Sequence, residues 1–286
     1  MAKPIKNIAA SIRQRLFNLA QAQGQPFDVI LVRYGLERLL YRLSISQYRN
    51  RFVLKGGLLV TLWIEDVMRV TRDLDLLGFG DDDAEHLVTI FHEILSIDTD
   101  DGLAFDSDNI ASVAIREELE YGGTRLRTTA ILAGAKIPIT VDIGFGDAVT
   151  PAADDVEFVS LLDQGAPNVR AYAPETVIAE KFQAMVALGM INGRMKDYYD
   201  LWAIPRSRTI RQEALADAIK ATFARRNTPI PREPPPGLSP AFYASPEKLR
   251  QWTTYAESIG FSGVTLEDVV THIWDVLSSA CVQASQ

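Results

Sequence analysis

The pair of aspartates in Asp73-Leu74-Asp75-Leu76 constrains the fold of this chain more than any other feature of its sequence. In an extended strand, residues i and i+2 point to the same face of the sheet. Asp73 and Asp75 are therefore expected to project together, while Leu74 and Leu76 face the core. Two adjacent carboxylates repel each other unless a cation lies between them, and Mg²⁺ prefers such oxygen ligands together with substrate phosphates. The segment predicts a strand over 70–77 that carries a divalent-cation site.

A glycine pair precedes this strand, in Lys55-Gly56-Gly57. The apolar residues before it predict a short buried strand over 52–55, and a helix is expected over 58–64. Glycine lets the backbone come close to a phosphate group, and the start of a helix offers free N–H groups and a positive dipole end. The glycine pair therefore predicts a phosphate-binding loop beside the carboxylates.

A third acid, Asp142, lies in the hydrophobic segment 139–145. A site that holds two metal ions and transfers a phosphoryl group usually needs a third carboxylate. A charge within so apolar a strand is costly unless it meets a cation or hydrogen-bond donors. The alternative is an edge strand with Asp142 facing water. Asp147 is a weaker candidate, because it follows Gly144 and Gly146 in an expected turn.

A second polar cluster follows Pro174. Lys181 lies on a helix expected over 175–190, and another helix is expected over 197–203, where Lys196 and Asp200 lie four residues apart. Residues four apart on a helix face each other, so Lys196 and Asp200 also fit an ordinary surface ion pair worth a few tenths of a kcal/mol. Taken alone, the cluster favours that structural interpretation.

The spacing of hydrophobic residues predicts the remaining elements. Helices are expected over 5–23, 27–45, 212–225, 246–259 and 266–282, with another that opens at 81–84, and strands over 113–115, 124–132 and 137–143. The segment 227–240 has six prolines and is expected to be an extended connector without helix. The pattern indicates an α+β domain over 1–170, with a mixed, mainly antiparallel sheet flanked by helices, and a mainly helical C-terminal domain over 171–286.

Charge is distributed unevenly along the chain, whose net charge is −8. The first sixty residues hold ten Lys and Arg against two acids, and the rest holds nineteen against thirty-five. A basic segment on an acidic body fits either a surface for a polyanion or solvated helix faces. No stretch is apolar enough to span a membrane or to act as a signal peptide, and a lone cysteine, Cys281, cannot form an internal disulfide. A cytoplasmic protein is expected.

The motifs occur together in one order: the glycine pair, the DLD strand, the hydrophobic-Asp-hydrophobic strand, a helix with Glu180-Lys181, and an RxKDxxD helix that begins at Arg194. In this order they resemble the AbiEii family of toxin nucleotidyltransferases, within the DNA polymerase β-like superfamily. The resemblance covers roughly residues 30 to 280. It implies a nucleotidyltransferase fold with the active cleft between the two domains, where Lys181 and Asp197 would face Asp73.

The resemblance also implies a role for each matching residue. Asp73, Asp75 and Asp142 would hold Mg²⁺ or Mn²⁺ and, with Lys181 and Asp197, form the catalytic set. The nucleotide-binding set implied is Lys55, Gly56, Gly57, Lys181, Arg194, Lys196 and Asp200. One departure concerns the residue after the glycines, which is commonly Ser or Thr in the family and is Leu58 here.

The activity implied is metal-dependent transfer of a nucleotidyl group from an NTP to an acceptor, with the 3′ end of tRNA as the expected RNA acceptor. Family members are toxins of bacterial toxin–antitoxin or phage-defence pairs, so a cognate antitoxin is an expected partner. The alternative is a catalytically weakened fold that serves as a partner-binding module. A phosphohydrolase that uses the aspartate pair is less supported, and His86, His92 and His272 are too scattered to favour a histidine metal site.

Overall fold

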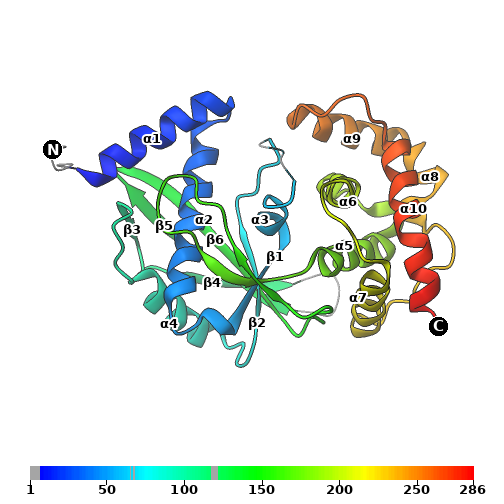
Figure 1. Cartoon of the computed structure of the whole chain (residues 1–286), viewed down its shortest axis with the longest axis horizontal. Coiled ribbons are helices and arrows are strands. Elements are labelled where there is room, and N and C mark those ends of the chain that lie inside the picture. Colours follow the sequence, from blue (N-terminus) through cyan, green and yellow to red (C-terminus); the bar gives the residue numbers. More distant parts are fainter. Residues whose placement is uncertain (1–6, 65, 67, 117–121) are drawn as a thin grey trace. The chain divides into compact units, whose positions relative to one another are not determined.

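The computed structural model describes residues 7–64, 66, 68–116 and 122–286 (Figure 1). The chain forms two compact units. The first unit comprises the chain up to Leu62, Val70–Gly146 and Asp155–Ala171, and the second comprises Trp63–Arg69, Asp147–Asp154 and Tyr172–Gln286. The first residues of the helix expected from residue 5 lie outside the described part of the chain.

The first unit is built on a mixed sheet. Its helical elements are α1 (Ile8–Gln23), α2 (Phe27–Ile45), the 3₁₀ turn η1 (Arg49–Arg51), α3 (Gly56–Val60) and α4 (Ala84–Leu95). Its strands are β1 (Phe52–Lys55), β2 (Leu74–Gly78), β3 (Leu103–Phe105), β4 (Ala111–Arg116), β5 (Gly122–Leu132), β6 (Ala135–Phe145), β7 (Asp154–Glu157, whose first residue belongs to the second unit) and β8 (Asn168–Ala171).

The strand order is β3-β5-β6-β2-β1-β8-β7, and β4 pairs with β5 outside this path. Strand β2 runs parallel to β6, and β1 runs parallel to β8. The other pairings described, β1–β2, β3–β5, β4–β5 and β5–β6, are antiparallel. The prediction of an α+β fold with a mixed, mainly antiparallel sheet flanked by helices is therefore confirmed.

Helix α2 packs on one face of this sheet, and its residues are buried along most of its length. Gly35 permits the close approach, because a Cβ atom at this position would lie only 2.8 Å from Cδ1 of Ile139 on β6. Ile137, Ile139 and Val141 are buried on this side. The intervening residues Thr140 and Asp142 therefore point to the opposite face of the sheet.

The basic N-terminal segment places two of its arginines in the interior of the first unit. Arg38 and Arg42 are both almost completely buried, and both donate hydrogen bonds to the carboxylate of Asp101. Arg49 donates to Asp155 and to Asn168. These three arginines bind acidic or polar groups of the protein itself. A surface of this segment that binds a polyanion would therefore have to use other basic residues.

The second unit is helical. It contains α5 (Pro174–Leu188), η2 (Gly189–Ile191), α6 (Met195–Ser207), α7 (Gln212–Arg225), η3 (Pro236–Leu238), α8 (Pro240–Tyr243), α9 (Pro246–Ser258) and α10 (Leu266–Ala284). Helix α5 packs against α7, and α10 packs against both α6 and α7. The searched, described residues include no helix that is long and apolar enough to cross a membrane.

Two local expectations were wrong. The proline-rich segment is not free of helix, because η3 and α8 each begin at a proline. Proline fits the first helical position, where its missing N–H would have no partner in any case. Helix α3 begins at Gly56 and ends at Val60, rather than spanning 58–64, so both glycines lie within its first turn.

Candidate active site

Three carboxylates converge at the sheet of the first unit. One oxygen from each of Asp73, Asp75 and Asp142 lies within 4.8 Å of the other two. Strands β2 and β6 are parallel neighbours, and their register places Asp75 directly opposite Asp142. Asp73 lies immediately before β2 rather than inside it, as the strand begins at Leu74. The two carboxylates of the DLD pair nevertheless reach the same site.

The loop before β2 orients Asp73. The hydroxyl of Thr71 is part-buried and donates a 2.7 Å hydrogen bond to Oδ1 of Asp73. This bond limits the orientations that the Asp73 carboxylate can adopt. A ligand carboxylate held by an outer partner is typical of metal sites.

The glycine pair contacts Asp75 in this structure. The Gly57 N–H donates to Oδ2 of Asp75 over 3.0 Å. Gly56 has a positive φ of 66°, and a Cβ atom added to it would lie 2.0 Å from the same Oδ2. Only glycine provides both this backbone conformation and this close approach. The two glycines therefore fix the position of the central acid of the site.

The pKa of Asp75 reflects this crowding. Burial raises the pKa of its carboxyl group to about 6, and repulsion by Asp73 adds to the effect. The hydrogen bond from Gly57 and the charge of Lys55 act in the opposite direction but do not cancel it. The raised pKa therefore reflects mainly the removal of this carboxylate from water and, second, its closeness to another acid.

Asp142 lies on an interior strand, because β6 has β2 on one side and β5 on the other. Its side chain is 17% exposed, so the alternative of a water-facing acid on an edge strand was wrong. Arg125 lies opposite Asp142 on β5. It donates from Nε to Oδ1 over 2.6 Å and from an NH₂ group to Oδ2 over 2.5 Å.

The donor set fits a divalent cation. All three side chains offer oxygen atoms, which are the ligands that Mg²⁺ and Mn²⁺ prefer. Burial and the neighbouring carboxylate of Asp73 both raise the pKa of Asp75, so a cation bound at this site would favour the ionised form of Asp75. The identity of the metal is a separate question that three carboxylates alone do not decide.

The second unit contains a buried cluster of opposite charges. The carboxylate of Asp200 on α6 is completely buried, and Arg69 donates to both its oxygens over 2.5 Å. Lys181 on α5 lies 2.9 Å from Asp200 and also donates to Asp197. Burial alone would raise the pKa of Asp200, but Lys181 and Arg69 outweigh it and hold the pKa below its ordinary value.

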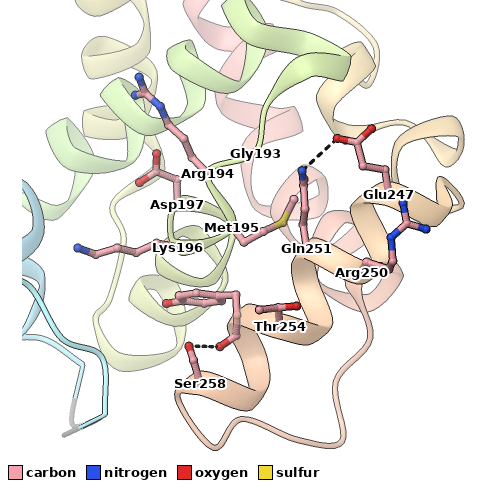
Figure 2. Close-up of a pocket in the computed structure, with 11 residues that line it drawn as sticks. Gly193, Arg194, Met195, Lys196, Asp197, Glu247, Arg250, Gln251, Thr254 and Ser258 are labelled. Atoms are coloured by element: carbon pink, nitrogen blue, oxygen red, sulfur yellow. Dashed lines mark hydrogen bonds between the residues drawn. The ribbon is translucent and has the colours of Figure 1, made fainter. Parts of the chain in front are cut away.

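A pocket of about 850 Å³ lies beside this cluster, between the start of α6 and helix α9. Arg194, Lys196 and Asp197 line one side, and Figure 2 shows the side chains of Arg194 and Lys196 extending in different directions. Gln251 lies on the α9 side and donates to Glu247 over 3.1 Å. The pocket therefore combines cationic, anionic and amide groups.

The model of one protein family, the nucleotidyl transferase AbiEii toxin of type IV toxin–antitoxin systems, matches residues 38–273. This match covers most of the chain and includes all three acids. The chain belongs to the AbiEii family. The predicted resemblance is thereby confirmed, and with it the assignment of the chain to the nucleotidyltransferases.

Solved structures also resemble this AbiEii chain at low identity. A Helicobacter pylori protein named only provisionally as a nucleotidyltransferase is 13% identical, with a TM-score of 0.46 over 89% of this chain and 94% of that one. JHP933 from Helicobacter pylori is also 13% identical, with a TM-score of 0.45 over 88% and 90%. An antigenic nucleotidyltransferase-like protein from Paracoccidioides brasiliensis is 15% identical, with a TM-score of 0.41 over 85% and 91%. The comparison with curated proteins finds no match.

Within the AbiEii chain, the residues singled out from the sequence fall into two groups. Those of the first unit, Lys55, Gly56, Gly57, Asp73, Asp75 and Asp142, lie at the carboxylate site. Those of the second unit, Lys181, Arg194, Lys196, Asp197 and Asp200, lie in the buried cluster or line the pocket. A cleft that joins the two groups stays a prediction.

Sequence reasoning missed two arginines that hold the acids of these groups. Arg125 and Arg127 lie on either side of Leu126 in β5. This alternation indicates on which face of the strand Arg125 lies, but not which residue it pairs with. Arg69 precedes β2 in a segment with no strong periodicity, and its pairing with Asp200 depends on chain far away in sequence. Leu58 is buried in the core, so the residue that departs from the family pattern packs inward.

Proposed function

We propose that this AbiEii chain transfers a nucleotidyl group from an NTP to the 3′ end of tRNA, and that it acts as the toxin of a toxin–antitoxin or phage-defence pair. The observation that supports the proposal most directly is the convergence of Asp73, Asp75 and Asp142 within 4.8 Å in a chain of this family. Phosphoryl transfer depends mainly on positioning and on neutralisation of charge, which this arrangement can provide.

Asp73, Asp75 and Asp142 would hold Mg²⁺ or Mn²⁺, which when bound neutralises charge on the phosphates and on the attacking oxygen. In the reaction, the oxygen of the acceptor hydroxyl forms a bond to the α-phosphorus. The bond from that phosphorus to the oxygen bridging to the β-phosphate breaks, and pyrophosphate leaves. The proton of the hydroxyl passes to a carboxylate of the site, for which Asp142 is the proposed base.

The proposed nucleotide-binding residues are cationic or lie close to the site. Lys55 places a positive charge near Asp75, and the glycine pair holds the backbone close to the carboxylate of Asp75. Lys181 is proposed to bind the triphosphate, with Asp197 and Asp200 holding its ammonium group. Arg194 and Lys196 line the pocket of the second unit, which is proposed to receive part of the nucleotide.

The RNA acceptor and the antitoxin are proposed on family membership. The family is described as toxins of type IV toxin–antitoxin systems, so a cognate antitoxin is the expected protein partner. Exposed basic residues such as Arg13 and Arg15 on α1 are candidates for contacts with RNA phosphates.

The test is to incubate the protein with each radiolabelled NTP, Mg²⁺ and total cellular RNA, and to separate the products on a denaturing gel. We expect a labelled band of tRNA size with the wild type and none with Asp73→Asn or Asp75→Asn. Asp108→Asn is the matched control, because Asp108 is exposed and lies outside the site. Full labelling by the Asp73 and Asp75 variants would refute the proposed catalytic role.

Calorimetry separates this proposal from a catalytically weakened module that only binds a partner. An active enzyme should release or absorb heat when an NTP is added, and this heat should depend on a divalent cation. A well-folded protein that gives no cation-dependent heat with any NTP, but still binds its antitoxin, would favour the partner-binding module.

A further inference from the structure

Asp142 differs from the other two acids of the site because both of its oxygens are already occupied. The guanidinium of Arg125 binds them through two parallel hydrogen bonds of 2.6 and 2.5 Å. A two-bond pair between arginine and a carboxylate is the strongest common form of side-chain ion pair, and its geometry is fixed by the planar guanidinium. A single protein partner, Arg125, therefore holds both oxygens of Asp142.

The sheet itself holds Arg125 in this position. Strands β5 and β6 form the longest ladder described in this chain, and its register places Arg125 directly opposite Asp142. The Arg125 side chain is 34% exposed, so it has room to move outward without disturbing the core. Its positive charge is also stabilised by Asp73 and Asp75, which together with Asp142 raise the pKa of Arg125.

From this geometry we propose that Arg125 competes with the divalent cation for Asp142 and thereby lowers the cation affinity of the site. The proposal rests on the cation site described under the proposed function. An ion bound between the three acids lies beside the guanidinium, and two positive charges at such short range repel each other. Binding of the ion is therefore an exchange, in which Arg125 gives up at least part of its contact with Asp142.

The exchange links the cation to the nucleotide. A guanidinium displaced from a carboxylate pairs readily with a phosphate, which accepts the same two parallel hydrogen bonds. A triphosphate that arrives with the ion supplies this replacement partner, whereas a bare ion does not. The cation and the NTP are therefore expected to bind more tightly together than either binds alone, and Arg125 is the positioning residue for this coupling.

The test measures Mn²⁺ binding to the metal-free protein by titration calorimetry and by electron paramagnetic resonance of free Mn²⁺. We expect Arg125→Gln to bind Mn²⁺ at least about tenfold more tightly than the wild type, because a full positive charge next to the ion is removed. Arg127→Gln is the matched control. Arg127 lies two residues further along the same face of β5, opposite Thr140 rather than an acid, and should leave the affinity within about twofold.

Arg125→Lys serves as a second variant if the glutamine variant folds poorly. It keeps the charge but offers one ammonium group in place of the planar fork, so its Mn²⁺ affinity should lie between those of the wild type and Arg125→Gln. Addition of a non-hydrolysable NTP analogue should tighten Mn²⁺ binding more in the wild type than in Arg125→Gln.

The possible failures are distinguishable. If the folded wild type binds no Mn²⁺ with or without the NTP analogue, the cation site is refuted, and this inference with it. If the wild type binds Mn²⁺ but Arg125→Gln binds it equally or more weakly, this inference alone is refuted and the proposed cation site stands.

Discussion

Replacement of Gly56 by alanine tests whether the glycine pair exists to position Asp75. The backbone of Gly56 has a φ of 66°, and a Cβ atom there would lie 2.0 Å from Oδ2, 2.4 Å from Cγ and 2.5 Å from Cβ of Asp75. Because the Cβ of Asp75 is fixed to strand β2, a change of rotamer cannot remove the whole overlap. The backbone at the junction of β1 and α3 must shift away from the acid.

The expected cost has two parts. Alanine in the left-handed region costs about 1–2 kcal/mol. Forcing the backbone and Asp75 apart adds about 1–3 kcal/mol, as in other overpacked sites. Gly56→Ala should therefore lower the free energy of unfolding by about 2–5 kcal/mol, and it should weaken Mn²⁺ binding at least about tenfold, since one of three carboxylate ligands is displaced.

Gly24→Ala is the matched control. Gly24 has nearly the same φ, 64°, but a Cβ atom there meets nothing within 4 Å. It should lose only the cost of the backbone conformation, about 1–2 kcal/mol, with no change in Mn²⁺ binding. Urea unfolding and calorimetric titration measure both quantities. Equal losses of stability in the two variants, with Mn²⁺ affinity unchanged in both, would show that Gly56 does not position Asp75.

Three further predictions concern the buried charges. The raised pKa of Asp75 means that the metal-free folded state holds this proton more tightly than the unfolded chain. The stability that protonated Asp75 contributes is present below pH 3.8, declines as the pH rises and is lost above about 6. Asp75→Asn should therefore stabilise the metal-free protein against urea unfolding more at pH 7 than at pH 4. An equal effect at the two pH values would contradict this prediction. The same proton competes with the cation, so Mn²⁺ affinity measured by calorimetry should fall as pH drops below about 6, and a flat profile would argue against Asp75 as a ligand. Asp200→Asn removes the anion that Arg69 and Lys181 share, so it should lower the free energy of unfolding in urea by about 3–5 kcal/mol. Asp155→Asn, in the exposed pair with Arg49, should lower it by less than about 1 kcal/mol. Similar losses in the two variants would refute this reasoning.

The local pattern of the sequence predicted the parts of the site that depend on one strand. Alternation of aspartate and leucine indicated that Asp73 and Asp75 share a face, and the apolar flanks of Asp142 indicated a strand. Asp73 proved to lie just outside β2, yet it still reaches the site, because the loop before the strand is held by the bond from Thr71. The convergence of the acids was therefore predicted better than the exact limits of the strand.

The partners of the acids could not be predicted in the same way, because they depend on pairings far apart in the sequence. The parallel pairing of β2 with β6 and the position of Arg125 opposite Asp142 are properties of the folded sheet. Helical spacing likewise suggested a surface pair between Lys196 and Asp200. The structure instead buries Asp200 with Arg69 and Lys181, which come from a loop and another helix.

The same limit applies to the charge of the N-terminal segment. Arg38 and Arg42 follow a helical spacing that also fits a solvated face, and a long side chain can reach either solvent or the interior. Burial of both around Asp101 depends on a residue in a later loop. A count of charges along the chain therefore overestimated the positive surface of this segment.

The parallel pairing of β2 with β6 also determines when an ion can begin to stabilise the protein. Asp75 and Asp142 belong to strands that are separated in sequence by α4 and by β3, β4 and β5, so their pairing must close a long loop of chain. The antiparallel β5–β6 hairpin can form earlier from local contacts. A bound cation should therefore slow the loss of the native state far more than it accelerates its formation.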